Sequence, residues 1–338
     1  MKAILVGCGG ISGAWLSAPT VKEKVEIAGL VDIRKEAAEN KAKEFGLTGA
    51  VIGTDLKEVL SATKPDAVFD CTVPEAHCAV TLTALAHGCH VLGEKPLADT
   101  MANAHKMVAA AGKARRIYAV IQNRRYQCEI RALKSFIDSG AIGKVTTVQS
   151  NFFIGAHFGG FRDRMKHVLL LDMAIHTFDA ARFLTGADAK AVYCHEWNPA
   201  GSWYDHDASA AAIFEMTGGI VYTYQGSWCA EGRATTWEAD WRIVGQGGSV
   251  LWDGGNAFRA EASEKEAAFI RKVRSIDVPL ECPKEKTGGH DGVIGEFVRC
   301  VQEGGVPETT CTDNIKSLAM VHAAVESAGK RRRTIVRA

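Results

Sequence analysis

The sequence predicts an α/β protein of two domains: a doubly wound parallel sheet, then an α+β domain with a large, open and mostly antiparallel sheet. At 338 residues the chain is long for a single hydrophobic core. Up to residue 122, short apolar runs alternate with amphipathic segments, as in βαβ units. Beyond residue 126, β-rich runs follow one another with few helices between them. We therefore expect domains over residues 1–122 and 123–338.

The first domain is expected to hold six strands, each an apolar run beside turn residues. They are 3–6, 26–31, 50–52, 67–69, 90–92 and 117–121. Helices are expected at 35–45 and 75–87, because a glycine follows each amphipathic segment and glycine commonly ends a helix. Pro19 should cut the first crossover helix short after about two turns, since proline breaks a helix interior.

The second domain should begin with a helix at 129–138, which Gly140 ends. The β-rich runs that follow are 144–154, 189–197, 209–216, 220–228, 236–244 and 249–252. Thr217-Gly218-Gly219 supplies a hairpin turn between two of them. Two helices, near 293–303 and 313–328, close the chain. Strands with so few crossovers predict a mostly antiparallel sheet that is open on at least one face.

Composition and charge argue against several classes of protein. Lys and Arg number 40 and Asp and Glu 39, so no overall field favours nucleic acid or an anionic membrane. No apolar run approaches the ~20 residues that span a bilayer, and a strand starts too early to leave room for a signal peptide. The ten cysteines form no CxxC pairs, so we expect buried thiols in a reducing compartment. These features predict a cytoplasmic protein that binds neither nucleic acid nor membrane.

A glycine turn, Gly7-Cys8-Gly9-Gly10-Ile11-Ser12, follows the first strand and opens a helix. Gly7 permits the tight bend, Gly9 lets the backbone approach a pyrophosphate, and the helix directs N–H groups at the phosphates. Asp32 ends the second strand and suits the ribose hydroxyls of NAD. Arg34 nearby could pair with the extra phosphate of NADP, which leaves that cofactor as the less favoured choice.

Polar residues follow the other parallel strands, at the edge where ligands of such sheets bind. They are Thr72, Glu94 and Gln122. In Glu94-Lys95-Pro96 the proline keeps Lys95 out of a regular helix. A lysine there is placed beside a bound nicotinamide and can hydrogen-bond a substrate hydroxyl, although Lys-Pro after a strand is also typical of an ordinary loop.

Asp172, His176 and Asp179 lie four and three residues apart, so a helix over 169–179 would place them in one polar column. The spacing alone favours a solvated polar face with a satisfied histidine, and the combination with the other two motifs reverses that preference. Oxidation of a secondary alcohol needs a base at the hydroxyl while the nicotinamide faces the C–H bond. His176 is the candidate base, Asp172 would orient it, and Lys95 would offset the developing alkoxide.

Together these motifs resemble the Gfo/Idh/MocA oxidoreductase family, which includes glucose-fructose oxidoreductase and inositol dehydrogenase. The specific part of the resemblance is Glu94-Lys95-Pro96 followed by Asp172-x-x-x-His176, and it extends over nearly the whole chain. It implies an N-terminal Rossmann domain and a C-terminal domain whose sheet forms homodimers or homotetramers. It also implies that Lys95, Asp172 and His176 are the catalytic set and that Pro74 and His77 line the cofactor.

The candidate site residues fall into two further groups. The expected NAD-binding residues are Gly7, Gly9, Gly10, Ile11, Ser12, Asp32, Ile33, Arg34, Thr72, Pro74, His77, Glu94, Lys95, Gln122 and Arg125. The expected substrate-binding residues are Lys95, Arg125, Tyr126, His157, Arg162, Asp172, His176 and Trp228. Residues 157–167 form either a lid or an ordinary mobile loop, and no metal is expected.

The sequence therefore predicts an NAD-dependent dehydrogenase that acts on a secondary alcohol of a sugar, sugar derivative or cyclitol. Polar partners for hydroxyl groups, together with aromatic faces, favour such substrates over an apolar ketone. Two alternatives stay open. One is a glycoside hydrolase that uses NAD without net redox change; the other is a non-catalytic sensor that binds a nucleotide, which would have no need of all three catalytic residues.

Overall fold

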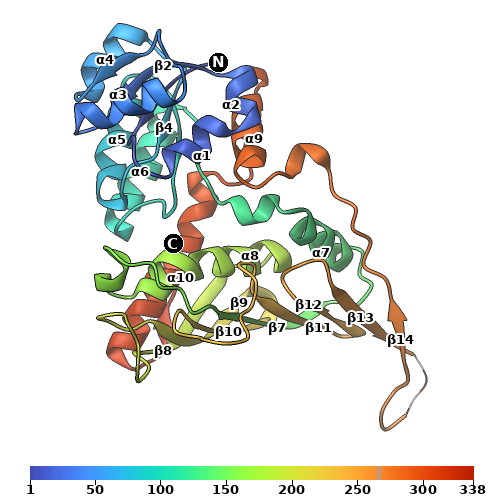
Figure 1. Ribbon diagram of the computed structural model, residues 1–338. Helices are drawn as coiled ribbons and strands as arrows, with labels where there is room; N and C mark the ends of the chain where they lie inside the picture. The colour runs from blue at the N-terminus through green and yellow to red at the C-terminus, as the bar shows by residue number, and fades with distance from the viewer. Residues whose placement is uncertain (265, 267) are drawn as a thin grey trace. The chain divides into compact units, whose positions relative to one another are not determined.

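The computed structural model describes residues 1–264, 266 and 268–338, which form two compact units (Figure 1). The first unit consists of Met1–Tyr126 with Pro283–Leu318, and the second of Gln127–Cys282 with Ala319–Ala338. Residues 283–318 lie within the predicted second domain, 123–338, but belong to the first unit. The reason is helix α9 (His290–Glu303), whose Phe297 ring lies 6.2 Å from the ring of Phe69 in the core of that unit.

The first unit contains a parallel sheet in the order β3-β2-β1-β4-β5-β6, the order of a Rossmann fold. Its strands are β1 (Lys2–Val6), β2 (Glu26–Val31), β3 (Val51–Gly53), β4 (Ala67–Asp70), β5 (His90–Gly93) and β6 (Tyr118–Val120). All six agree with the predicted strands to within two residues at either end. The predicted doubly wound sheet is confirmed.

Helices cover both faces of this sheet. They are α1 (Ser12–Ser17), α2 (Pro19–Lys24), α3 (Lys35–Glu44), α4 (Leu56–Thr63), α5 (Pro74–Ala86) and α6 (Met101–Ala114), with α9 beside α1 and α2. Pro19 ends the first crossover helix as predicted and starts α2 at its first position. α4 and α6 were not predicted, although both begin at capping side chains, Asp55 and Thr100.

The second unit is built on a nine-stranded sheet in the order β14-β13-β12-β11-β7-β10-β9-β8-β15. Its strands are β7 (Val145–Phe153), β8 (Ala189–Trp197), β9 (Ser209–Met216), β10 (Val221–Ser227), β11 (Asp240–Gly245), β12 (Gly248–Trp252), β13 (Phe258–Ser263), β14 (Val273–Ile276) and β15 (Thr334–Ile335). Among the described strands of this sheet only β7 and β10 pair in parallel, so the predicted mostly antiparallel sheet is confirmed. β11 starts four residues later than predicted, because the amide of Ala239 closes a turn onto the carbonyl of Thr236.

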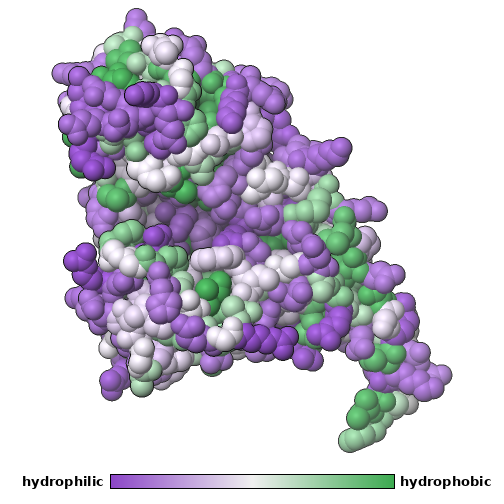
Figure 2. All heavy atoms as spheres, viewed as in Figure 1, coloured by the Kyte–Doolittle hydropathy of each residue, from purple (hydrophilic) through white to green (hydrophobic). Residues whose placement is uncertain are grey.

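One face of this sheet is covered and the other is open. α7 (Cys128–Asp138), α8 (Ile175–Thr185) and the later part of α10 (Cys311–Lys330) lie along one face in Figure 1. Side chains alternate between buried and exposed along β8 and β9, as expected for a half-covered sheet. The chain leading into β14 carries exposed Phe269 and Ile270, and Figure 2 shows apolar surface at that end of the unit.

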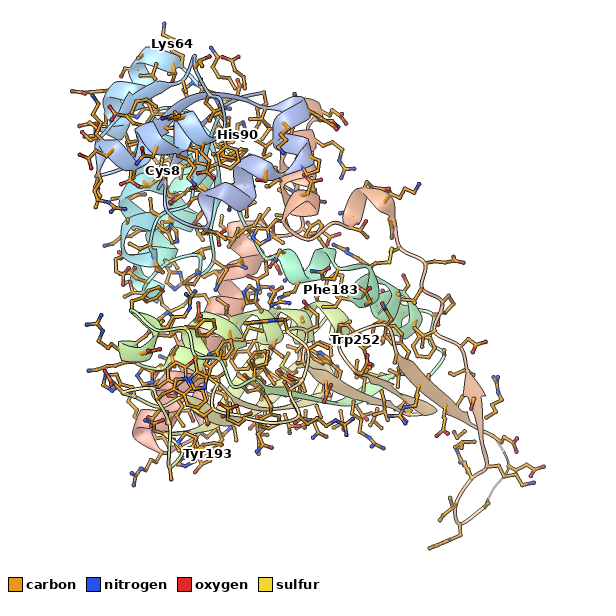
Figure 3. All side chains as sticks on the ribbon, viewed as in Figure 1. Cys8, Lys64, His90, Phe183, Tyr193 and Trp252 are labelled. Carbon is orange, nitrogen blue, oxygen red and sulfur yellow. A yellow bond between two sulfur atoms is a disulfide. The ribbon has the colours of Figure 1, made fainter. Side chains whose placement is uncertain are left out.

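The cysteines depart from the expectation that all are thiols. Cys128 and Cys282, which are 154 residues apart, form a disulfide. Local spacing could not reveal this pair, because only the fold brings the two ends of the 127–282 segment together. The other eight cysteines are free and six of them are buried; burial raises the pKa of the Cys8 thiol, labelled in Figure 3, to about 11. Among the described residues, no helix is both long and apolar enough to cross a bilayer.

Candidate active site

The glycine turn after β1 is shaped by close backbone approach on one side and open space on the other. Gly7 has a φ of +88°, and a Cβ there would lie 2.7 Å from the carbonyl carbon of Cys71, so only glycine fits. A Cβ on Gly9 or Gly10 would meet nothing within 4 Å. The Ser12 hydroxyl donates to the carbonyl of Gly9 at 2.6 Å and fixes the turn. The open side can therefore admit the pyrophosphate of a dinucleotide.

Asp32, at the carboxyl end of β2, stabilises the glycine turn by hydrogen bonding. Its Oδ2 accepts a hydrogen bond from the amide of Cys8 at 2.8 Å, and its Oδ1 accepts one from the amide of Arg34 at 2.9 Å. A carboxylate can accept about four hydrogen bonds, so the two ribose hydroxyls of NAD can still donate to it. Ile33 is almost fully exposed beside it. These residues fit the cofactor that the sequence predicts.

A buried acid at the end of β4 organises the next loop of the sheet edge. Asp70 Oδ1 accepts from the amide of Thr72 at 3.0 Å and from its hydroxyl at 2.5 Å, while Asp70 Oδ2 lies 2.9 Å from His77 Nδ1. His77 lies in the first turn of α5, which Pro74 begins, and its buried Nε2 has no hydrogen-bond partner among the residues that the structure describes. Asp70 was not among the predicted site residues, although an acid that ends an apolar strand two residues before a threonine is a signal that the sequence contains.

Glu94, after β5, anchors the loop that carries Lys95. The buried Glu94 Oε1 accepts from Trp15 Nε1 at 2.8 Å, and Oε2 accepts from the amide of Lys95 at 3.2 Å. The Lys95–Pro96 peptide is cis. The Glu94 amide in turn donates to the carbonyl of Asp70 at 2.8 Å, which ties this loop to the end of β4. His290 in α9 lies 3.9 Å from Glu94, and burial lowers the pKa of this histidine. His290 was not among the predicted site residues.

Three predicted residues near the end of the first segment are held inside the first unit. Asn314 Nδ2 donates to the buried Gln122 Oε1 at 3.4 Å, and the buried Arg125 donates to Asp313 at 2.7 Å. Tyr126 is fully buried, and its hydroxyl donates to Glu296 of α9. The ring of Tyr126, predicted to bind substrate, thus packs in the core of the first unit.

Asp172 and His176 lie in the second unit on a helix that changes its winding. Residues Leu169–Ala174 form a π-helix that runs into α8, in place of the regular helix expected over 169–179. Short π-helical turns often occur at functional sites. Asp172 Oδ2 accepts from Arg162 Nε at 2.8 Å, and His176 is 8 % exposed in the first turn of α8. Asp179 is fully buried and pairs with Arg182 at 3.8 Å.

The segment 157–167 surrounds Arg162 with aromatic rings. The guanidinium carbon of Arg162 lies 5.0 Å from the ring centre of Phe158 and 4.8 Å from that of Phe161. His157 stacks on Trp203 with ring centres 3.7 Å apart and bonds Glu231 at 2.8 Å. Trp228 is buried, so the flat face predicted to receive a substrate is covered by its neighbours.

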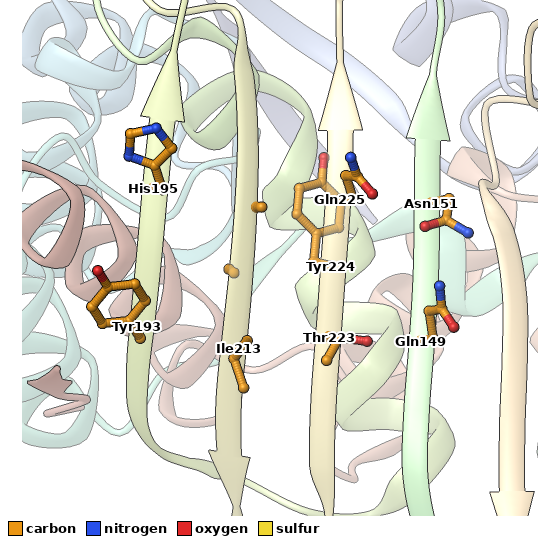
Figure 4. A pocket seen from close by; sticks show the side chains of 10 residues that line it. Gln149, Asn151, Tyr193, His195, Ile213, Thr223, Tyr224 and Gln225 are labelled. Atoms are coloured by element: carbon orange, nitrogen blue, oxygen red, sulfur yellow. The ribbon is translucent and has the colours of Figure 1, made fainter. Parts of the chain in front are cut away.

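Surface hollows mark another part of the second unit. One of 320 Å³ lies on the open face of the sheet, where side chains of four neighbouring strands project together in Figure 4. The labelled residues that project from this face are Gln149, Asn151, Tyr193, His195, Ile213, Thr223 and Gln225, whereas the labelled Tyr224 points to the covered face, where its ring centre lies 5.2 Å from that of Phe178. None of the predicted site residues lines it. In the described part of the chain, no three His, Cys, Asp or Glu side chains are grouped so as to hold a metal ion.

Comparison with known families identifies the chain. Residues 1–122 match the model of an oxidoreductase family with an NAD-binding Rossmann fold, and residues 130–251 match the Gfo/Idh/MocA C-terminal domain. The chain belongs to the Gfo/Idh/MocA family. As a Gfo/Idh/MocA protein it is an oxidoreductase that acts on CH–OH groups, with a cofactor of the NAD type.

Several Gfo/Idh/MocA relatives are similar over much of the chain. A 1,5-anhydro-D-fructose reductase of Ensifer adhaerens is 25 % identical, covering 96 % of this chain and 95 % of that protein. A D-glucoside 3-dehydrogenase of Escherichia coli is 28 % identical, covering 66 % and 69 %. A levoglucosan dehydrogenase, solved with NADH and levoglucosan, superposes with a TM-score of 0.82 at 20 % identity, over 100 % of both chains. This last likeness concerns the fold alone.

Proposed function

We propose that the protein is an NAD-dependent dehydrogenase that transfers a hydride between a secondary alcohol of a sugar, sugar derivative or cyclitol and the nicotinamide. The observation that carries the proposal is that the chain retains both candidate proton-handling groups, Lys95 after β5 and the largely buried His176 with Asp172 one turn before it. Relatives with related names include a D-glucoside dehydrogenase and inositol dehydrogenases. A family member that only senses a nucleotide would not need these groups.

The proposed mechanism assigns one task to each side chain. NAD, when bound, supplies the hydride acceptor. His176 accepts the proton of the substrate hydroxyl, because an imidazole is the side chain most often used as a general base. Asp172 orients the imidazole and stabilises its charged form, while Lys95 donates a hydrogen bond to the same oxygen and offsets its developing charge. The cofactor would be held by the open glycine turn and by Asp32.

The experiment that tests the function is a screen of polyols, aldoses and glycosides for reduction of NAD, followed spectrophotometrically, with chromatography of the products. We expect NADH to accumulate with at least one sugar or cyclitol. Release of free sugar from a glycoside without accumulation of NADH would instead identify the NAD-assisted hydrolase. If nucleotide binds but no compound turns over, the protein is a sensor and the proposal is wrong.

Cofactor choice gives a separate prediction. We propose NAD rather than NADP, because the Asp32 carboxylate would repel a 2′-phosphate. Asp32→Asn removes the charge but keeps a side-chain oxygen, so we expect the ratio of NADPH to NADH affinity to rise about 10-fold, which is ~1.4 kcal/mol. Fluorescence titration with both reduced cofactors measures this ratio. Glu36→Gln, which neutralises a nearby acid on α3, is the control; tighter binding of NADPH by the unmodified protein would overturn the choice of NAD.

We also propose that the protein forms a homodimer or homotetramer through the open face of the second unit's sheet. Tyr193 and Ile213 are 50 % and 52 % exposed there, and Tyr193 lies on the side of the sheet opposite the helices (Figures 3 and 4). Ile213→Asp should therefore convert the assembly to monomers, as measured by light scattering during gel filtration. Val306→Asp, an equally charged change at an exposed apolar residue of the first unit, should leave the mass unchanged. A monomeric unmodified protein would contradict the proposal.

A cytoplasmic location stays a prediction. Eight free cysteines are typical of a protein in a reducing compartment. The Cys128–Cys282 disulfide, in contrast, is a bond that forms more often in oxidising compartments.

A further inference from the structure

A group of aromatic rings is exposed together in the second unit, and none of them was predicted to bind substrate. Phe158, Phe161 and Trp237 are 39 %, 65 % and 48 % exposed, and we call them the aromatic platform. The buried Trp228 supports two of them: its ring centre lies 5.0 Å from that of Phe158 and 5.7 Å from that of Trp237. Large apolar side chains that are exposed side by side commonly mark a binding site.

Two rings of the platform, Phe158 and Phe161, are one side chain away from Asp172. Arg162 packs its guanidinium over Phe158 and Phe161 and donates through Nε to the Asp172 carboxylate at 2.8 Å. If a sugar ring is held near Asp172, a second group attached to that ring can therefore reach the platform. A cyclitol or free monosaccharide, which is a single ring, would leave the platform unused.

We propose that the aromatic platform binds the second ring of the substrate, so that the natural substrate is a glycoside and not a free sugar or a cyclitol. This inference rests on the proposed dehydrogenase function. Aromatic faces pack well against an aryl ring or against the C–H face of a second sugar. Polar groups beside the rings, the His157–Glu231 pair and the Arg162–Asp172 pair, can bond the hydroxyl groups of such a ligand. A few exposed rings are too small an area for a stable protein partner.

The test compares substrates that differ only in the second ring. Methyl and phenyl β-D-glucosides, and the matched pair of galactosides, are measured for kcat/KM with NAD, with myo-inositol as a reference that has no aglycone. We expect phenyl glycosides to exceed methyl glycosides by about 10-fold or more, because only the phenyl group reaches the platform. Equal values for the two members of every pair would overturn the inference.

Substitutions in the platform test whether its rings cause the preference for phenyl over methyl glycosides. Trp237→Ala should lower the phenyl-to-methyl ratio of kcat/KM about 5- to 10-fold while leaving kcat/KM for the methyl glycoside within about 2-fold, and Phe161→Ala should lower the same ratio about 5- to 10-fold. Trp237→Phe, which keeps a ring, should retain most of the ratio. Phe269→Ala removes an exposed aromatic ring outside the platform and is the matched control. A loss of activity that is equal for both glycosides would show a structural role only.

Binding measurements separate this inference from the proposed function. Calorimetric titration of phenyl β-D-glucoside, with and without NADH, should give a dissociation constant about 10-fold lower than that of the methyl glycoside, and Trp237→Ala should abolish the difference. If the phenyl compound binds tighter but no sugar reduces NAD, the dehydrogenase proposal fails and the platform stands. If sugars reduce NAD but the two glycosides bind equally, the platform fails alone.

Discussion

Lys95→Ala and His176→Ala are each expected to lower kcat by about 10²- to 10⁴-fold, the usual contribution of a positioned acid or base. His176 is the proposed acceptor of the hydroxyl proton, and water would have to replace it in a site where this side chain is 8 % exposed. Without Lys95, the charge that develops on the substrate oxygen loses its ammonium partner. Both losses concern the transition state, so kcat should fall far more than KM rises.

The same variants should still bind NADH, because the glycine turn and Asp32 are untouched. Fluorescence titration should give dissociation constants within about 3-fold of the unmodified protein, and this separates a catalytic defect from a folding defect. Lys57→Ala and His87→Ala change the same residue types at exposed positions of the first unit and should keep full activity. Turnover that is unchanged in either active-site variant would refute the role assigned to that residue.

Breaking the Cys128–Cys282 bond is expected to produce the largest change in stability. The bond closes a loop of 154 residues that includes most of the second unit. Restricting so long a loop in the unfolded chain is worth about 5 kcal/mol in the chain-entropy model. Cys128→Ser should therefore lower the Tm of the second unit by roughly 10–20 °C. Differential scanning calorimetry measures the shift.

A dithiol reductant should reproduce the effect in the unmodified protein, with thiol titration of the unfolded chain rising from eight groups to ten. Cys78→Ser and Cys229→Ser alter partly buried free cysteines and should leave the Tm little changed. If the titration shows ten thiols and the Tm is unchanged, the stabilising role of the bond is wrong.

Much of the fold could be predicted from local patterns in the sequence. The bounds of β2, β8 and β9 were predicted to the residue, because each is an apolar or alternating run beside turn residues. The short, polar β14 was missed for the opposite reason, since VRSI has no apolar face to reveal it. α9 was predicted as a helix, but its packing against β5 and Phe69 depends on long-range contacts that no local pattern contains.

Some features of the candidate site could likewise be predicted from local patterns, and others could not. Asp32, Lys95, Asp172 and His176 were predicted because their residue types and spacing match the chemistry they would perform, and their roles stay predictions. Asp70 was missed because its partners, Thr72 and His77, are defined by hydrogen bonds that a sequence does not display. The π-helix around Asp172 also lay beyond prediction, because one extra residue in a turn leaves the apolar pattern of the segment almost unchanged.

The division of both units along the chain has a consequence for synthesis on the ribosome. The core of the first unit needs Phe297 from α9, which is translated only after the whole of 127–282. Until α9 has been made, Trp15 and Phe69 lack some of the apolar side chains that bury them. The face of the sheet that α9 later covers is then accessible to other chains. The second unit must likewise wait for residues 319–338. Each unit therefore completes its core only after a late segment of the chain has been made, and chaperones that shield apolar surface should act on the partly made chain.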